Sequence, residues 1–260
     1  MSHPHILIDS KDGIVTIEIS RREKKNAITS DMYRAMSAAL SRARDDSHVR
    51  VVLLRGQEDM FTAGNDLADF LQRKVGDPSA AIPFLHLIAA FEKPIVAAVA
   101  GNAVGIGTTM LLHCDLVYAA DNAKFQLPFV NLALCPEAGS SLMLPRVAGY
   151  QRAAELLLLG EPFDAATARE AGFVNRVVAA DQLMATALAA AQKLAALPAQ
   201  SLAVTKALMK RPPDRSAIEA MDEEVIYFSD LVAAPAAKEI FSAFLEKRIP
   251  NPEKIHGRQK

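Results

Sequence analysis

Residues 94–109 read PIVAAVAGNAVGIGTT, and this stretch decides the fold class of the chain. The apolar run at residues 94–99 predicts a short strand. The glycines at 101, 105 and 107 follow it, and they allow positive φ and a close backbone approach before another helix. Short apolar strands separated by helical stretches are typical of a sheet that helices cover on its faces. The sequence therefore predicts an α/β protein.

The same alternation extends to both sides of this stretch. Strands are expected at residues 14–19, 51–54 and 116–120, and a helix at residues 30–44 with Ser30 or Asp31 as its N-cap. From residue 182 onward the chain is rich in Ala and Leu, with helix breaks at Pro198, Pro212 and Pro213, and Pro235. We expect a core over residues 1–199 and a helical C-terminal region over residues 200–260.

Composition excludes several classes of function. The chain has 260 residues, of which 51% are hydrophobic, so it can bury one large core. Its 29 basic and 30 acidic residues balance to a net charge of −1, which gives no support for nucleic-acid or membrane binding. Cys114 and Cys135 lie in apolar contexts outside any CxxC pair, so buried, reduced thiols and a cytoplasmic location are expected. No cluster with metal-ligand spacing occurs, so no metal is expected.

A single carboxylate stands out further along the chain. Between Phe125 and Pro145 the only charged side chain is Glu137. An acid among apolar residues is expected to have a raised pKa and to serve as a proton carrier. The segment Pro-Glu-Ala-Gly is also ordinary turn chemistry, and by itself it favours a turn.

Three segments combine glycine or basic residues with helix starts. RREKKNA, residues 21–27, suits an anion-contacting loop, although a solvated loop is the better explanation of this segment taken alone. FTAGNDL, residues 61–67, and GNAVGIGTT, residues 101–109, each place a glycine before a helix. Free backbone N–H groups at two such starts could hold one oxygen between them, whereas the simpler alternative is a turn capped by Asp66.

In this order the segments resemble the enoyl-CoA hydratase/isomerase (crotonase) superfamily over roughly residues 14–248. KKNAI, AGNDL and PEAGSS, at residues 24–28, 63–67 and 136–141, are most similar to the Δ3,Δ2-enoyl-CoA isomerases of the peroxisomal type. The resemblance implies a spiral of ββα units, and C-terminal helices that build a homotrimer or a dimer of trimers. It also implies an acyl-CoA substrate and no separate cofactor, because CoA is part of that substrate.

The resemblance also implies roles for individual residues. Glu137 would be the catalytic base, and the backbone N–H groups of Asn65 and Ile106 would hold the thioester oxygen. Lys24 and Lys247 are further candidates to contact CoA, and residues 80–91 could form a mobile helix over the site. The implied contacts to substrate and CoA are Lys25, Ala27, Ala63, Gly64, Asp66, Leu67 and Gly105.

Two departures from the family pattern bear on the reaction. The two glutamates of the hydratases would fall at Thr109 and Phe129, and neither position carries an acid. Water addition needs a group that activates water and a proton source, so moving a double bond from position 3 to position 2 fits better. The alternatives are another crotonase-type reaction, such as hydrolysis or a lyase step, a non-catalytic acyl-CoA-binding protein, and an oligomeric scaffold. His113 is interpreted as structural.

Overall fold

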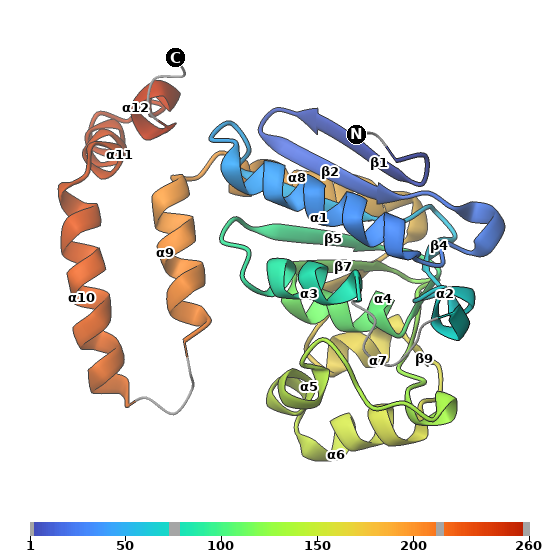
Figure 1. Ribbon diagram of the computed structural model, residues 1–260. Coiled ribbons are helices and arrows are strands. Elements are labelled where there is room, and N and C mark those ends of the chain that lie inside the picture. The colour runs from blue at the N-terminus through green and yellow to red at the C-terminus, as the bar shows by residue number, and fades with distance from the viewer. Residues whose placement is uncertain (1–2, 73–78, 212–215, 257–260) are drawn as a thin grey trace.

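The computed structural model describes residues 3–72, 79–211 and 216–256, and Figure 1 shows two sheets with helices around them. The strand order is β1-β2-β3-β5-β7-β10 in the larger sheet and β4-β6-β8-β9 in the smaller one. The β1–β2 and β8–β9 pairs are antiparallel, and the other strand pairs in these two described sheets are parallel. The strands are β1 (Ile6–Lys11), β2 (Ile14–Ile19), β3 (Val51–Arg55), β4 (Met60–Thr62), β5 (Ile95–Val99), β6 (Asn102–Val104), β7 (Leu116–Ala120), β8 (Lys124–Gln126), β9 (Phe163–Asp164) and β10 (Arg176–Val178).

Successive strand pairs are divided between the two sheets. β3 is followed by β4, β5 by β6 and β7 by β8, so each pair adds one parallel strand to each sheet. Between β5 and β6 the chain reverses at Gly101, whose φ is +62°. A Cβ on Gly101 would lie 1.8 Å from the Asp59 carbonyl oxygen, so only glycine fits this turn. Repetition of the pair produces the predicted spiral of ββα units.

Helices close both faces of the larger sheet and form the C-terminal end of the chain. Short 3₁₀ segments (Arg22–Lys24, Met110–His113, Val130–Leu132, Ala180–Gln182) and one π-helical segment (Glu155–Leu159) connect them. The α-helices are α1 (Ser30–Asp45), α2 (Leu67–Gln72), α3 (Ala81–Ala89), α4 (Ile106–Thr109), α5 (Ser140–Ala148), α6 (Tyr150–Ala154), α7 (Ala165–Glu170), α8 (Leu183–Ala195), α9 (Ala199–Met209), α10 (Ala217–Ala233), α11 (Pro235–Leu245) and α12 (Pro252–His256).

The apolar strands are buried on both faces, which explains their composition. Successive side chains of a strand point to opposite faces. On β3, Val52 and Leu54 therefore enter the main core, while Val51 and Leu53 pack in a second cluster that α8 covers. A strand covered on both sides needs apolar residues at every position. This is why residues 51–54 and 94–99 could be identified as strands from the sequence.

Two expectations about the helices need correction. α1 forms as predicted, but its N-cap is Thr29, whose hydroxyl accepts from the Met32 N–H, rather than Ser30 or Asp31. A helix also forms within residues 80–91. Its Phe84 and Ile88 are each only 1% exposed and belong to the main core, so α3 is anchored and the expected mobile cover is wrong.

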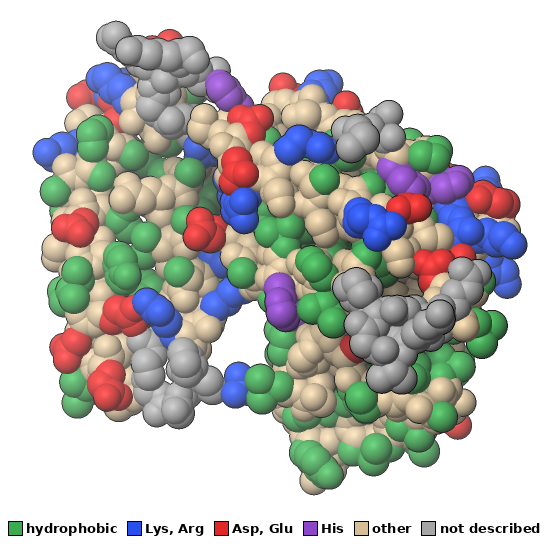
Figure 2. All heavy atoms as spheres, viewed as in Figure 1, with side chains coloured by type: hydrophobic (Ala, Val, Ile, Leu, Met, Phe, Trp, Pro, Cys, Tyr) green, Lys and Arg blue, Asp and Glu red, His purple; other side chains and the backbone are tan. Residues whose placement is uncertain are grey.

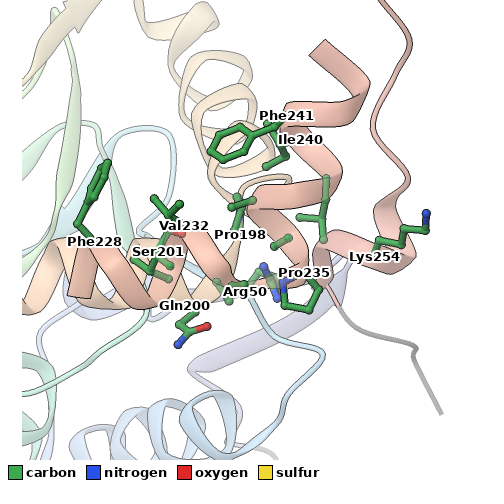
Figure 3. A pocket seen from close by; sticks show the side chains of 16 residues that line it. Arg50, Pro198, Gln200, Ser201, Phe228, Val232, Pro235, Ile240, Phe241 and Lys254 are labelled. Atoms are coloured by element: carbon green, nitrogen blue, oxygen red, sulfur yellow. The ribbon is translucent and has the colours of Figure 1, made fainter. Parts of the chain in front are cut away.

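The helices α9–α12 form an arm beside the rest of the chain, which we call the body (Figure 1). Figure 2 shows an opening between the arm and the body, with hydrophobic side chains spread along the arm. Phe244, Leu245 and Ile249 are 82%, 79% and 88% exposed. A cavity of about 680 Å³ lies where the arm meets Arg50 of the body, lined by apolar residues such as Phe228 and others of α10 and α11 (Figure 3).

The predicted breaks agree with the arm where they can be examined. Pro198 precedes α9 and Pro235 begins α11, while Pro212 and Pro213 lie outside the described residues. The boundary between residues 1–199 and 200–260, and the role of the arm in trimerisation, stay predictions. No helix of the described ranges has both the length and the apolar character needed to cross a membrane.

The two cysteines differ in their environments. Cys114 is half-buried, and burial raises the pKa of its thiol to about 12. Cys135 is exposed, so the expectation that both thiols are buried is wrong. Its neighbours Leu132 and Leu134 are also about half exposed, at 48% and 47%, and an apolar sequence context therefore did not indicate burial here.

Candidate active site

Two loops at the ends of parallel strands form the first part of the candidate site. β4 and β6 pair in parallel, with Thr62 opposite Ala103. The segments that follow the two strands therefore leave the small sheet at the same edge. Gly64 follows β4 with φ +91°, and a Cβ there would lie 2.7 Å from the Val104 carbonyl oxygen. The backbones of the two loops are therefore in direct contact, which places Asn65 near the start of α4.

Each loop presents a backbone N–H without a partner in the described part of the chain. The residues around Asn65 are tied to the neighbouring segment, because Ile28 N–H donates to the Gly64 carbonyl (2.8 Å) and Asp66 N–H donates to the Ile28 carbonyl (2.9 Å). The N–H of Asn65 itself makes no hydrogen bond within the described residues. Ile106 is the first residue of α4, and its N–H is one of the orphan donors of a helix start.

The basic loop lies beside these donors. Ala63 N–H donates to the Lys25 carbonyl at 2.9 Å, which joins the loop to the segment after β4. Arg21 is not available for a phosphate as it stands, because its guanidinium donates to Asp66 at 2.6 Å and thereby lowers the pKa of that carboxyl. Lys24 and Lys25 are exposed, and Leu67 is 55% exposed. These side chains can reach a ligand from solvent.

Asn26 holds the basic loop in place. It is fully buried, and its side-chain amide donates to the carbonyls of Met60 (3.0 Å) and Phe61 (3.1 Å). Its side-chain oxygen accepts from the Arg21 N–H at 2.6 Å, and its backbone carbonyl accepts from the Thr62 hydroxyl at 2.6 Å. These bonds fix the loop against β4, so Ala27 and Lys25 stand in a defined position next to Ala63.

Glu137 lies on a turn with two consecutive left-handed residues, Ala138 at φ +56° and Gly139 at φ +68°. The Ser140 N–H donates to the Glu137 carbonyl at 3.0 Å, and two side chains add further hydrogen bonds to this turn. Ser140 donates its hydroxyl to the Glu137 carbonyl at 2.7 Å, and His113 Nε2 lies 2.8 Å from the Ala138 carbonyl. Since a carbonyl only accepts, His113 donates from Nε2, and burial lowers its pKa, which favours this neutral form. His113 is structural, as expected, but it acts on the turn that carries Glu137.

The Glu137 carboxylate has one side-chain partner within the described residues, the Thr109 hydroxyl, which donates to Oε1 at 2.9 Å. Burial raises the pKa of Glu137, and the hydrogen bond from Thr109 offsets this only in part. Thr109 is the last residue of α4 and Ile106 is the first. With a helix rise of about 1.5 Å per residue, α4 holds the Ile106 N–H and the group that contacts Glu137 within roughly one turn of each other.

Tyr33 of α1 reaches the same place. Its hydroxyl donates to the side-chain oxygen of Asn65 at 2.5 Å. Its ring packs against Phe84, with 5.5 Å between the ring centroids. Burial raises the pKa of Tyr33 well above its usual value, and the negative charge of Glu137 raises it further, so Glu137 is close. Tyr33, Asn65, Ile106, Thr109 and Glu137 thus form one cluster.

The sequence identified part of this cluster. Asn65, Ile106 and Glu137 were chosen through the family resemblance, and the structure places them on the loop after β4, at the start of α4 and on the turn before α5. Lys247 follows α11 in the arm, away from the basic loop of the same chain (Figure 1). The sequence reasoning missed Tyr33 and the bond from Thr109 to Glu137. The resemblance to the family pattern did mark position 109, and that could have drawn attention to the threonine. No group of side chains that could hold a metal ion occurs among the described residues.

Comparison with known proteins identifies the family that this chain resembles over most of its length. A family model described as enoyl-CoA hydratase/isomerase matches residues 9–254. A probable enoyl-CoA hydratase of Rhizobium meliloti is 33% identical over 95% of this chain and 97% of its own. Enoyl-CoA delta isomerase 2 of the rat is 36% identical over 84% of this chain and 57% of its own.

A solved structure extends the similarity to the fold. The protein, from Magnetospirillum magneticum, is named for enoyl-CoA hydratase and carnithine racemase. It is 42% identical, covers 100% of both chains and superposes with a TM-score of 0.93. The chain therefore belongs to the enoyl-CoA hydratase/isomerase family, within the crotonase superfamily.

Proposed function

We propose that this protein moves the double bond of a 3-enoyl-CoA to the 2-trans position, with Glu137 as the proton carrier. One observation carries the proposal: Glu137 is a half-buried acid with a raised pKa, and the two positions where hydratases carry their acids hold Thr109 and Phe129. A carboxylate whose pKa is raised toward neutrality is a better base and a better acid in turn. This chemistry needs one such group, whereas adding water needs two.

The steps balance without any external reactant. The Glu137 carboxylate removes a proton from C2, and the electron pair of that C–H bond moves toward the thioester carbonyl to give a dienolate. Glu137 then returns the same proton to C4, and the electron pair moves back to leave the double bond between C2 and C3. C2 and C4 can be served from one face of the planar dienolate, so a single carboxylate suffices.

The negative charge of the dienolate falls on the thioester oxygen. In the proposed complex the N–H groups of Asn65 and Ile106 donate to this oxygen from two sides. Loss of one such donor typically costs about 3–4 kcal/mol of transition-state stabilisation. Lys25, Ala27, Ala63, Gly64, Asp66, Leu67 and Gly105 would surround the thioester and the CoA chain, and the exposed lysines would face its phosphates.

A second candidate function is hydration of a 2-enoyl-CoA. It is favoured by the relatives named as hydratases, such as the Rhizobium meliloti protein. Glu137 would then have to activate water without a second acid, since Phe129, which is only 6% exposed, supplies no polar group at the other hydratase position. A family member that binds acyl-CoA without reaction would show neither activity.

One pair of substrates separates these functions. The purified protein is incubated with 3-hexenoyl-CoA and, separately, with crotonyl-CoA, and the products are identified by mass spectrometry and chromatography. Isomerisation predicts conversion of the first to 2-trans-hexenoyl-CoA with little hydration of the second. Hydration of crotonyl-CoA at a comparable or higher rate would contradict the proposal. A thermal-stability shift with CoA thioesters, without turnover of either, would identify a binding protein.

A further inference from the structure

Tyr33 is a polar residue in an apolar place. It belongs to the main core, is only 3% exposed, and packs its ring against Phe84 of α3. A buried hydroxyl needs a hydrogen-bond partner. The partner here is the side-chain oxygen of Asn65, 2.5 Å away, and not a backbone group of α1. The Tyr33 ring thus packs in the core, while its hydroxyl reaches into the candidate site.

The hydrogen bond from Tyr33 acts on Asn65, whose backbone N–H is one of the two proposed donors to the thioester oxygen. The backbone of Asn65 is tied on both sides through Gly64 and Asp66, while its own N–H stays without a partner in the described chain. The Asn65 side-chain oxygen accepts from the Tyr33 hydroxyl, which fixes the orientation of the side-chain amide of Asn65. Because burial and the charge of Glu137 both raise the pKa of Tyr33, the phenol keeps its proton and stays a donor at neutral pH.

We propose that Tyr33 is a positioning residue of the site: its hydroxyl, by donating to the Asn65 side chain, holds the Asn65 backbone N–H in place for the oxygen of a bound thioester enolate. The inference rests on the proposed function, since it assigns Asn65 the role given there. It adds a residue of α1 to a site otherwise built from loops and the short helix α4. Tyr33 itself does not touch the reacting atoms.

The test removes a single oxygen. Tyr33→Phe keeps the ring and its contact with Phe84 but cannot donate to Asn65. Tyr118→Phe is the matched control, because Tyr118 is half-buried on β7 in the second cluster and lies outside the site. Asn65→Ala keeps the backbone N–H but removes the acceptor. All three variants and the Tyr33→Phe/Asn65→Ala double variant are compared with the parent protein.

Two readouts are used. The first is kcat and KM for 3-hexenoyl-CoA. The second is the ultraviolet absorbance of the enolate of a bound 3-oxoacyl-CoA, an anion whose charge lies partly on the thioester oxygen. This second readout does not require isomerase activity, so it distinguishes failure of the inference from failure of the proposed function. Thermal unfolding reports separately on stability.

The expected result is a split between catalysis and binding. Tyr33→Phe should lower kcat by roughly three- to tenfold, the size of one lost hydrogen bond, with KM changed by less than about twofold. The enolate absorbance should fall in parallel, and Tyr118→Phe should change neither. In the Asn65→Ala background, loss of the Tyr33 hydroxyl should have little further effect, because both changes break the same bond.

Three results would overturn the inference. The first is a Tyr33→Phe variant that loses only thermal stability and keeps the parent's kcat and enolate absorbance. The second is full additivity of the two losses in the double variant, which would show that Tyr33 does not act through Asn65. The third is an equal effect of Tyr118→Phe. A reduced enolate absorbance in a protein that moves no double bond would support the inference while rejecting the proposed function.

Discussion

All five residues of β5 in the body are buried, whereas α10 in the arm has no buried residue over its 17 positions. Both elements are rich in apolar side chains, and α10 exposes Ile226 and Phe228 by 62% and 68%. The difference shows that the body completes its own core, because central strands such as β3 and β5 are covered on both faces. The arm presents apolar surface that nothing in the described chain covers. Such a surface is expected where another copy of the protein binds.

The largest effect should come from the body. Glu137→Gln keeps the shape of the side chain but removes the base, so we expect isomerase turnover to fall by about 10²–10⁴-fold. Binding of acyl-CoA and the oligomeric state should stay close to those of the parent protein, because the arm is unaffected. Stopped-flow assays and calorimetric binding provide the measurements. Near-normal turnover would show that Glu137 is not the proton carrier.

The next effect concerns the joint between the two regions. Lys206 of α9 is buried, and its ammonium group donates to Asp115 at 2.6 Å and to the Lys93 carbonyl at 2.8 Å. Lys206→Met removes the cation and leaves the Asp115 carboxylate with the Ile95 N–H but no positive charge beside it, so we expect the free energy of unfolding to fall by about 3 kcal/mol. Chemical denaturation measures this change.

Lys193→Met is the matched control for this joint, because Lys193 lies exposed on α8. It should change the unfolding free energy by less than about 0.5 kcal/mol. Equal effects of the two substitutions would show that the pair formed by Lys206 and Asp115 does not anchor α9 to the body.

A smaller effect is a pH-dependent gain of stability in the body. Because burial raises the pKa of Glu137, the folded protein binds this proton more tightly than the unfolded chain does. The contribution to stability is therefore present below the ordinary glutamate pKa of 4.5 and is lost as pH rises through the raised value. Glu137→Gln carries no such charge, so it should be more stable than the parent at pH 7 and about equal to it at pH 4. Denaturation curves at both pH values check the sign, and a less stable variant at pH 7 would contradict it.

The smallest effect on folding is expected in the arm. Phe244 and Leu245 are mostly exposed, so their joint replacement by Ser should change the unfolding free energy of the chain by less than about 0.5 kcal/mol. Assembly should respond instead. Sedimentation velocity should show trimers or hexamers for the parent protein and smaller species for the variant. A monomeric parent protein would refute the prediction of assembly through the arm.

The sequence predicted those elements whose signal is local. Residues 51–54 and 94–99 are strands buried on both faces, and an uninterrupted apolar run is enough to identify such strands. The three-residue strands β4, β6 and β8 were not predicted, because so few residues carry no periodicity and their pairing depends on partners some 20 to 40 positions away. The N-cap of α1 was misplaced by one or two residues, since Thr29, Ser30 and Asp31 all suit that role.

The candidate site shows the same division. Glu137 stood out because its neighbours in the sequence are uncharged, and glycines marked the loops of Asn65 and Ile106. Tyr33 gave no signal, because its partner lies 32 positions away and a tyrosine in an amphipathic helix resembles any other core residue. Cys135 was misjudged for a related reason: apolar sequence neighbours do not reveal whether a turn lies inside the protein or on its surface.

The bond between Thr109 and Glu137 has a consequence for any second acid placed at this spot. A carboxylate at position 109 would lie beside the carboxylate of Glu137. Two carboxylates at hydrogen-bonding distance do not both ionise near neutral pH, so one of them would hold a proton and the pair would titrate together. A threonine hydroxyl does not titrate in this range, so position 109 as it stands leaves the titration at this spot to Glu137 alone.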